Sequence, residues 1–175
     1  MNHSNKTVCV VGASGLLGSN VLKEALARGY KVNGTLRDVN APDKATFLNA
    51  LPNAEANLRL FEAEMADKAS FDDAFSNVDC VFIACLIPVY KGHTGKPARE
   101  MDDEQGYAEI IMPTVNGCLN IMNAAAKQGV KNVVICSSTS STNPIPPVPI
   151  KNELDHWSDE KEQCRAKNTP PQRKL

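Results

Sequence analysis

Three glycines at equal spacing, Gly12, Gly15 and Gly18, follow an apolar run at residues 8–11 and open a helical pattern. The first N–H groups of a helix have no partner within it, and with the helix dipole they bind phosphate oxygens. We assign the sharp turn out of the strand to Gly12, close approach of a pyrophosphate to Gly15, and close packing of helix on sheet to Gly18. The strand–turn–helix context predicts a dinucleotide site, although the G-x-x-G-x-x-G spacing differs by one residue from the dehydrogenase form.

A second candidate lies at the end of the next apolar run, about 20 residues beyond the glycine-rich turn, where such folds contact the adenosine ribose. Arg37 and Asp38 stand there. An acidic side chain would bind the 2′-hydroxyl of NAD, whereas an arginine presents a fork of donors to the 2′-phosphate of NADP. The alternative for Arg37 is a solvated residue at a strand end. We favour NADP(H) over NAD(H).

The last apolar run, residues 131–137, leads into hydroxyl side chains at Ser137, Ser138, Thr139, Ser140 and Ser141. Ligands of open α/β sheets bind at the carboxyl ends of the strands, so this segment is a candidate for substrate contact. The alternative is the serine-rich beginning of a loop.

Five apolar runs alternate with helical patterns along the chain, which predicts an α/β fold with helices on both faces of a parallel sheet. The predicted fold is a Rossmann-type doubly wound sheet, incomplete at about five strands in the order 3-2-1-4-5, without a substrate domain. Ser70 is expected to cap a helix, and residues 88–106 to be irregular. The expected strands are residues 7–11, 31–37, 58–63, 78–85 and 131–137; the expected helices are 15–28, 41–51, 70–75 and 109–127.

Composition narrows the class of protein. The 175 residues are 42% hydrophobic with a net charge of −1, so one domain has ample core and no nucleic-acid or membrane surface is indicated. Six cysteines lack metal-ligand spacing, so we expect no metal and buried thiols in a reducing, cytoplasmic compartment. No apolar run reaches transmembrane length. We place the dinucleotide-binding domain at residues 7–150 and the beginning of a catalytic region at 151–175, with a disordered end.

The chain resembles the extended short-chain dehydrogenase/reductase superfamily, which is NAD-dependent epimerase/dehydratase-like, and is most similar to its dihydroflavonol reductase and cinnamoyl-CoA reductase branch. The resemblance covers residues 7 to about 167. The helix segment and the WSD…CRAK segment are the more specific to this branch. The matching segments are VVGASGLLGS, TLRD, FIAC-x-x-P, PTVNGCLNIMNAA, VVICSS and ELDHWSDEKEQCRAK.

The resemblance implies a role for each site residue. Ser138 would be the catalytic serine that hydrogen-bonds a substrate carbonyl. Glu64 departs from the aspartate expected at its position. The cofactor site would comprise Gly12, Ser14, Gly15, Leu16, Leu17 and Gly18 at the pyrophosphate, Arg37 at the 2′-phosphate, Glu64 and Met65 at the adenine, and Ala84 near the nicotinamide ribose.

One departure from the family is severe. The Tyr-x-x-x-Lys pair that supplies the proton is missing, because none of Tyr30, Tyr90 and Tyr107 has a lysine four residues later, and Pro170-Pro171 oppose a further helix. We therefore expect the cofactor-binding portion of a carbonyl or acyl-CoA reductase, inactive as this chain, with a carbonyl substrate only in a longer form. The alternatives are a non-catalytic NADP(H)-binding or regulatory protein and, more weakly, an epimerase or dehydratase relative. An open edge at the last strand predicts self-association.

Overall fold

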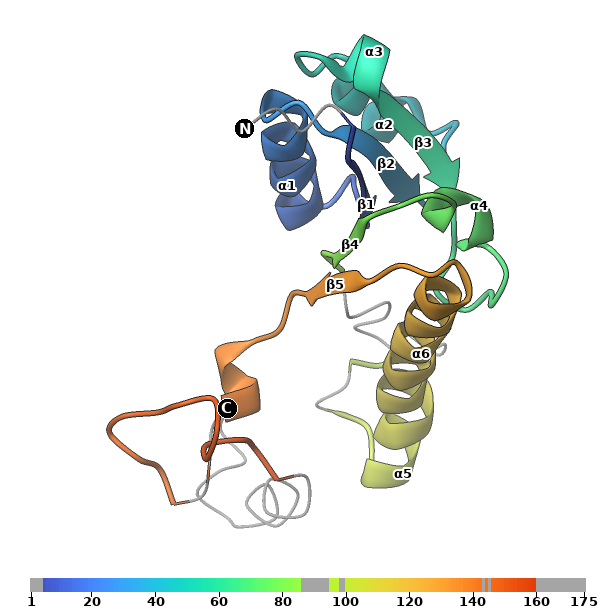
Figure 1. Ribbon diagram of the computed structural model, residues 1–175. Helices are drawn as coiled ribbons and strands as arrows, with labels where there is room; N and C mark the ends of the chain where they lie inside the picture. Colours follow the sequence, from blue (N-terminus) through green and yellow to red (C-terminus); the bar gives the residue numbers. More distant parts are fainter. Residues whose placement is uncertain (1–4, 86–94, 98–99, 143, 145, 160–175) are drawn as a thin grey trace. The chain divides into compact units, whose positions relative to one another are not determined.

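Figure 1 shows a computed structural model of the protein, in which residues 5–85, 95–97, 100–142, 144 and 146–159 are described. The chain divides into two compact units, Met1–Cys136 and Ser137–Leu175, and each is described by itself. The expected disordered end, residues 168–175, lies outside the described residues.

The first unit is built on a five-stranded sheet in the order β3-β2-β1-β4-β5, with every neighbouring pair parallel. This confirms the predicted fold class and strand order. Parallel pairing brings the carboxyl ends of β1, β2, β3 and β4 to the same edge of the sheet. The strands are β1 (Thr7–Val11), β2 (Lys31–Leu36), β3 (Leu58–Glu62), β4 (Cys80–Ile83) and β5 (Asn132–Ile135).

Helices cover both faces of the sheet, because successive side chains of a strand point to opposite faces. Val8 and Val10 of β1 pack into one apolar cluster with Leu22 and Leu26 of α1. Cys9 and Val11 pack into the other, with side chains of α4 and α6. The helices are α1 (Leu16–Ala27), α2 (Pro42–Asn49), α3 (Ala54–Asn57), α4 (Asp72–Phe75), α5 (Asp103–Gly106) and α6 (Met112–Lys127).

Two expectations about helix boundaries are wrong. Helix begins already at Asp103, inside the stretch expected to be irregular, because the Asp102 side chain accepts the Gln105 N–H and caps α5. A π-helical segment, η2 (Tyr107–Ile111), joins α5 to α6. It ends immediately before α6, whose first turn contains Pro113; a proline has no N–H for a regular i→i−4 bond. Ser70 does not cap α4, whose N-cap is Phe71.

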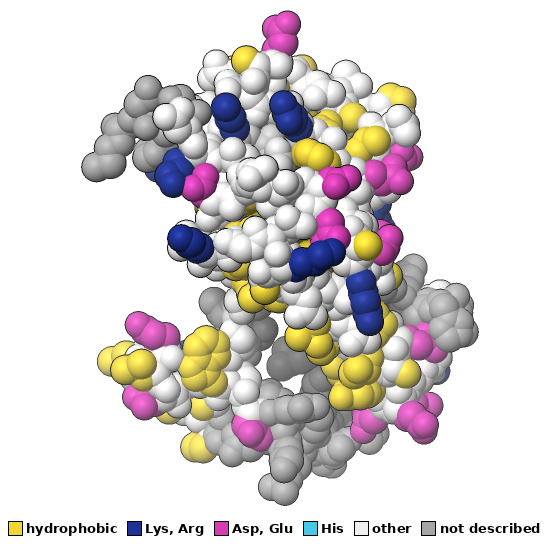
Figure 2. Space-filling model, turned by 45° about the vertical axis from the view of Figure 1, so that its right-hand side comes forward, with side chains coloured by type: hydrophobic (Ala, Val, Ile, Leu, Met, Phe, Trp, Pro, Cys, Tyr) yellow, Lys and Arg dark blue, Asp and Glu magenta, His cyan; other side chains and the backbone are white. Residues whose placement is uncertain are grey.

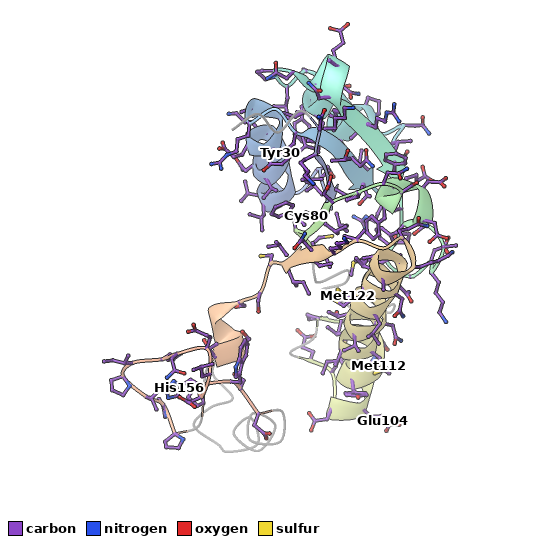
Figure 3. The ribbon with its side chains drawn as sticks, in the orientation of Figure 1. Tyr30, Cys80, Glu104, Met112, Met122 and His156 are labelled. Atoms are coloured by element: carbon purple, nitrogen blue, oxygen red, sulfur yellow. The ribbon has the colours of Figure 1, made fainter. Side chains whose placement is uncertain are left out.

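The elements α5, η2 and α6 follow one another without a gap. Glu104 lies in α5, Met112 at the beginning of α6 and Met122 nearer its end (Figure 3). One face of α6 is buried in the apolar cluster, while Val115, Leu119 and Met122 of α6 and Ile111 of η2 are exposed. Figure 2 shows hydrophobic side chains gathered on this part of the surface, below a region richer in Lys and Arg. No helix among the described residues is long and apolar enough to cross a membrane.

The second unit contains the hydroxyl-rich segment that follows β5. Its described part has a 3₁₀ turn, η3 (Thr139–Thr142), in which Ser141 Oγ donates to the Ser138 carbonyl at 2.6 Å. The Ser158 N–H donates to the Ser141 carbonyl at 2.8 Å. Trp157 is fixed within the unit by its Nε1 donating to the Glu153 carbonyl at 2.7 Å.

Candidate functional site

A cavity of about 220 Å³ opens at the carboxyl edge of the first unit's sheet. It lies where β1, β2 and β3 end, so residues distant in sequence share its wall. Cys85, which follows β4, and Phe71, in the loop before α4, complete it. Of the predicted site residues, the cavity brings together Gly12, Ser14, Gly15, Arg37, Glu64 and Met65.

The glycine-rich turn has the backbone geometry that its sequence predicts. Gly12 has φ +77°, a conformation in which other residues are strained. Its N–H donates to Thr35 Oγ1 at 3.3 Å, and the Ala13 N–H donates to the Thr35 carbonyl at 3.0 Å. A Cβ on Gly12 would also meet the Sγ of Cys85 at 2.6 Å. The turn is therefore held between β2 and the residue that follows β4.

Gly18 is buried beneath this turn, not in the cavity wall. A Cβ there would overlap the Gly12 carbonyl oxygen and lie 3.1 Å from Ala13 Cα. Gly15 is different, because a Cβ at that position would meet nothing within 4 Å except the Gly12 carbonyl oxygen at 3.4 Å. The two glycines therefore have different roles. Gly18 allows α1 to pack directly on the turn, and Gly15 leaves space on the cavity side.

The beginning of α1 is chemically suited to an anion. Gly15 is its N-cap, no side chain caps it, and its first turn has no acidic residue. The first-turn N–H groups and the positive end of the helix dipole are thus not engaged by a side chain of the helix itself. Gly12, Ser14 and Gly15 line the cavity at this end of the helix.

Arg37 follows β2 directly, is exposed and lines the cavity. Its neighbour Asp38 is not part of the cavity wall. The Asp38 carboxylate instead accepts the Asn40 N–H at 2.8 Å, which closes a local turn. The Arg37 side chain therefore belongs to the site, whereas the Asp38 carboxylate hydrogen-bonds a backbone N–H of the adjacent turn.

Cys85 is a cavity residue that the sequence did not indicate. Burial raises the pKa of its thiol, the neighbouring Cys118 and Glu64 raise this pKa further, and Arg37 acts in the opposite direction. Cys85 is therefore close to charged groups of the cavity and mostly protonated near neutral pH. Thr35 was also missed, because the expected second strand, residues 31–37, contains other polar residues and Thr35 does not stand out among them.

Five predicted site residues are not in the cavity wall. Leu16 and Leu17 are exposed at the beginning of α1, and Gly18 lies beneath the turn. Ala84 packs against the apolar cluster on the α1 side. Ser138 belongs to the second unit, where its carbonyl oxygen accepts a hydrogen bond from Ser141 Oγ.

No group of three or more potential metal ligands occurs among the described residues.

The parallel sheet, the glycine turn at a helix N-terminus and the arginine after β2 together define a Rossmann-type dinucleotide-binding domain. The chain belongs to the NAD(P)H-binding family, which matches it over residues 12–168.

The chain is similar in sequence to known reductases of the branch that its motifs resemble. A bifunctional dihydroflavonol 4-reductase/flavanone 4-reductase from Malus domestica is 35% identical over 95% of this chain and 44% of its own. A cinnamoyl-CoA reductase from Medicago truncatula is 34% identical over 96% of this chain and 50% of its own. The similarity to the dihydroflavonol and cinnamoyl-CoA reductase branch is thereby confirmed. The chain spans about half the length of these curated relatives, or less.

The fold is also similar to that of a solved structure. The crystal structure of Gre2 from Candida albicans, determined in complex with NADPH, superposes with a TM-score of 0.63 at 26% identity. The match covers 79% of this chain and 38% of Gre2.

Proposed function

We propose that the chain binds NADP(H) in preference to NAD(H), as the cofactor-binding portion of a reductase that acts on a carbonyl or acyl-CoA thioester. The observation that carries the proposal is that Arg37 lines the cavity and its neighbour Asp38 does not. The Asp38 carboxylate is bonded to the Asn40 N–H. A guanidinium in this position offers donors to a 2′-phosphate, and the acid that would favour a 2′-hydroxyl is not part of the cavity wall.

The names of similar proteins support the reaction class. The two curated relatives are reductases, and the Gre2 structure contains NADPH. Within this chain, Ser138 is the residue proposed to hold the substrate carbonyl, since it matches the family's catalytic serine. The roles of Leu16, Leu17 and Ala84 near the pyrophosphate and nicotinamide ribose also stay proposals.

The binding test compares NADPH and NADH by isothermal titration calorimetry, with the unmodified chain and with Arg37→Ala. Each charge-assisted hydrogen bond is worth about 1.5–3 kcal/mol, so the NADPH preference should be roughly tenfold or more. Arg37→Ala should remove most of it and leave NADH affinity nearly unchanged, whereas Asp38→Asn, the neighbouring control, should keep it. Equal affinities for both cofactors in the unmodified chain would refute the preference.

We propose as a second function a non-catalytic NADP(H)-binding or regulatory protein, which would need no Tyr-x-x-x-Lys pair, and none occurs in these 175 residues. Cofactor binding is common to both proposals, and neither expects turnover from these 175 residues alone, so the transcript distinguishes them. An open reading frame that continues and encodes a Tyr-x-x-x-Lys pair would support the reductase, whereas a stop codon after Leu175 in the authentic message would support the second function.

A further inference from the structure

The loop between β3 and α4 contains the two residues proposed to contact adenine, and side chains from two directions hold it. From within the loop, Ser70 Oγ accepts the Glu64 N–H at 3.1 Å and donates to the Glu64 carbonyl at 2.9 Å. The Glu64 carboxylate accepts the Met65 N–H at 3.0 Å. Glu64 is therefore fixed through both its backbone and its side chain.

From the other direction, α6 contacts the same loop. The buried Asn120, 8% exposed, donates from Nδ2 to the Met65 carbonyl at 2.8 Å, across 55 residues of sequence. One turn earlier in α6, a Cβ on Gly117 would lie 3.1 Å from Met65 Cβ and nearer still to its Cε. Glycine at this position therefore allows the helix to reach Met65.

The bond between Asn120 and Met65 is not required by packing alone. Asn120 lies on the face of α6 that buries Ile121 and Ala124 in the apolar cluster, and an amide in such a place is unfavourable unless it is hydrogen-bonded. An aliphatic side chain would fill the space without that constraint. What the amide adds is a fixed position for the Met65 carbonyl, and hence for the Glu64–Met65 segment in the cavity wall.

We propose that Asn120 is a positioning residue for purine recognition, which holds Glu64 and Met65 where the carboxylate accepts a hydrogen bond from the 6-amino group of adenine. This inference rests on the proposed NADP(H) binding. A carboxylate has acceptor sites for more than one donor, so Glu64 can bind the Met65 N–H and an amino group together. Asn120 acts through Met65 and does not contact the cofactor itself. Its loss should therefore reduce the preference for adenine over other purines more than it reduces the affinity for the rest of the cofactor.

The test uses reduced NADPH and its hypoxanthine analogue, in which a 6-oxo acceptor replaces the 6-amino donor. The unmodified chain should bind NADPH about tenfold or more tightly than the analogue, as expected for one hydrogen bond to a charged group. Asn120→Leu should reduce this ratio to about threefold or less, mainly by weakening NADPH. Asn123→Leu, the same change at an exposed position of α6, should leave the ratio unchanged.

A second variant keeps the test decisive if Asn120→Leu does not fold by circular dichroism. Ser70→Ala releases Glu64 from within the loop and should also reduce the ratio. Binding of neither cofactor by the unmodified chain would contradict the proposed function itself. Binding of NADPH with the ratio preserved in the folded variants, no preference in the unmodified chain, or equal weakening of both cofactors would overturn the positioning role alone.

Discussion

Gly18 and Gly12 are in such close contact that no side chain fits between the beginning of α1 and the turn that follows β1. A Cβ on Gly18 would overlap the Gly12 carbonyl oxygen, which is backbone and has no rotamer to change. Gly12 itself has φ +77° and is bound through its N–H to Thr35. The spacing of these glycines is therefore a packing requirement of the fold as well as a feature of the cofactor site.

This contact predicts different outcomes for two similar substitutions. Gly18→Ala should lower the free energy of unfolding by at least about 1–3 kcal/mol, the usual effect of overpacking, because α1 must move away from the sheet. Gly15→Ala, whose Cβ has space and an ordinary φ of −74°, should change stability by no more than about 1 kcal/mol. It should nevertheless weaken NADPH binding by placing a methyl group in the cavity. Urea titration and calorimetry measure the two effects, and equal destabilisation by both variants would contradict this assignment.

The 175-residue chain, purified alone, should not reduce carbonyl compounds at a useful rate. Reduction needs a proton for the developing alkoxide, and a serine hydroxyl such as that of Ser138 is a poor acid near neutral pH. General acid catalysis typically contributes about 10²–10⁴-fold, and the family's tyrosine and lysine are missing from the sequence. NADPH consumption should therefore stay at background with aromatic aldehydes, flavanonols and acyl-CoA esters.

The control for turnover removes the available tyrosines. Tyr107 is exposed in η2, and Tyr90 lies outside the described residues. Activity that is lost in Tyr90→Phe/Tyr107→Phe would identify a substitute acid. Activity that survives in that double variant but disappears in Ser138→Ala would show that the missing proton donor does not limit the chain.

Alkylation of Cys85 should be slow at neutral pH and should report cofactor binding. The thiolate is the reactive form, and burial raises the pKa of this thiol above its ordinary value of 9.0. Because the pKa is raised, the thiolate fraction near pH 8 is smaller than for an exposed thiol, and the rate should keep rising above pH 9. Bound NADPH should slow the reaction further, since Cys85 lines the cavity.

Mass spectrometry of the iodoacetamide-treated chain gives the rate at each cysteine separately, and Cys85→Ala identifies the peptide. An equal Cys85 rate with and without saturating NADPH would place the cofactor away from this wall of the cavity.

The exposed edge of β5 should cause self-association. Within the part of the chain that the structure describes, β5 is the last strand in the order, and Val134 and Ile135 are 49% and 45% exposed. An open strand edge with exposed apolar side chains recruits other chains.

A second cavity, about 750 Å³, lies on the α1 side of β4 and includes Tyr30 and Cys80 in its wall; both residues are labelled in Figure 3.

Light scattering over a concentration series tests the expected self-association. The apparent mass should rise with concentration and fall towards that of a monomer in Val134→Lys, because a charge disfavours edge pairing. Asn123→Lys adds the same charge on the exposed face of α6 and should have little effect. A monomer at every concentration of the unmodified chain would contradict the expectation.

The sequence by itself determined the features that depend on local pattern. Apolar runs alternating with helical segments predicted the parallel sheet and its order, and the glycine spacing after residues 8–11 located the turn. The position of Arg37 after the second run also followed from spacing. These signals are local because backbone conformation and strand periodicity depend on neighbouring residues.

Only the tertiary structure decided which side chains meet across the chain. Nothing near Asn120 in sequence indicates a bond to the Met65 carbonyl, and nothing near Cys85 indicates contact with Gly12. The same is true of Ser70, which resembles a helix cap by pattern but binds Glu64. The Asn120 contact depends on the packing of α6 on the sheet, the Cys85 contact on the register of β4 with β1, and the Ser70 contact on the path of a single loop. A buried polar group takes whichever partner this packing brings within reach, and that choice leaves no periodic trace in the sequence.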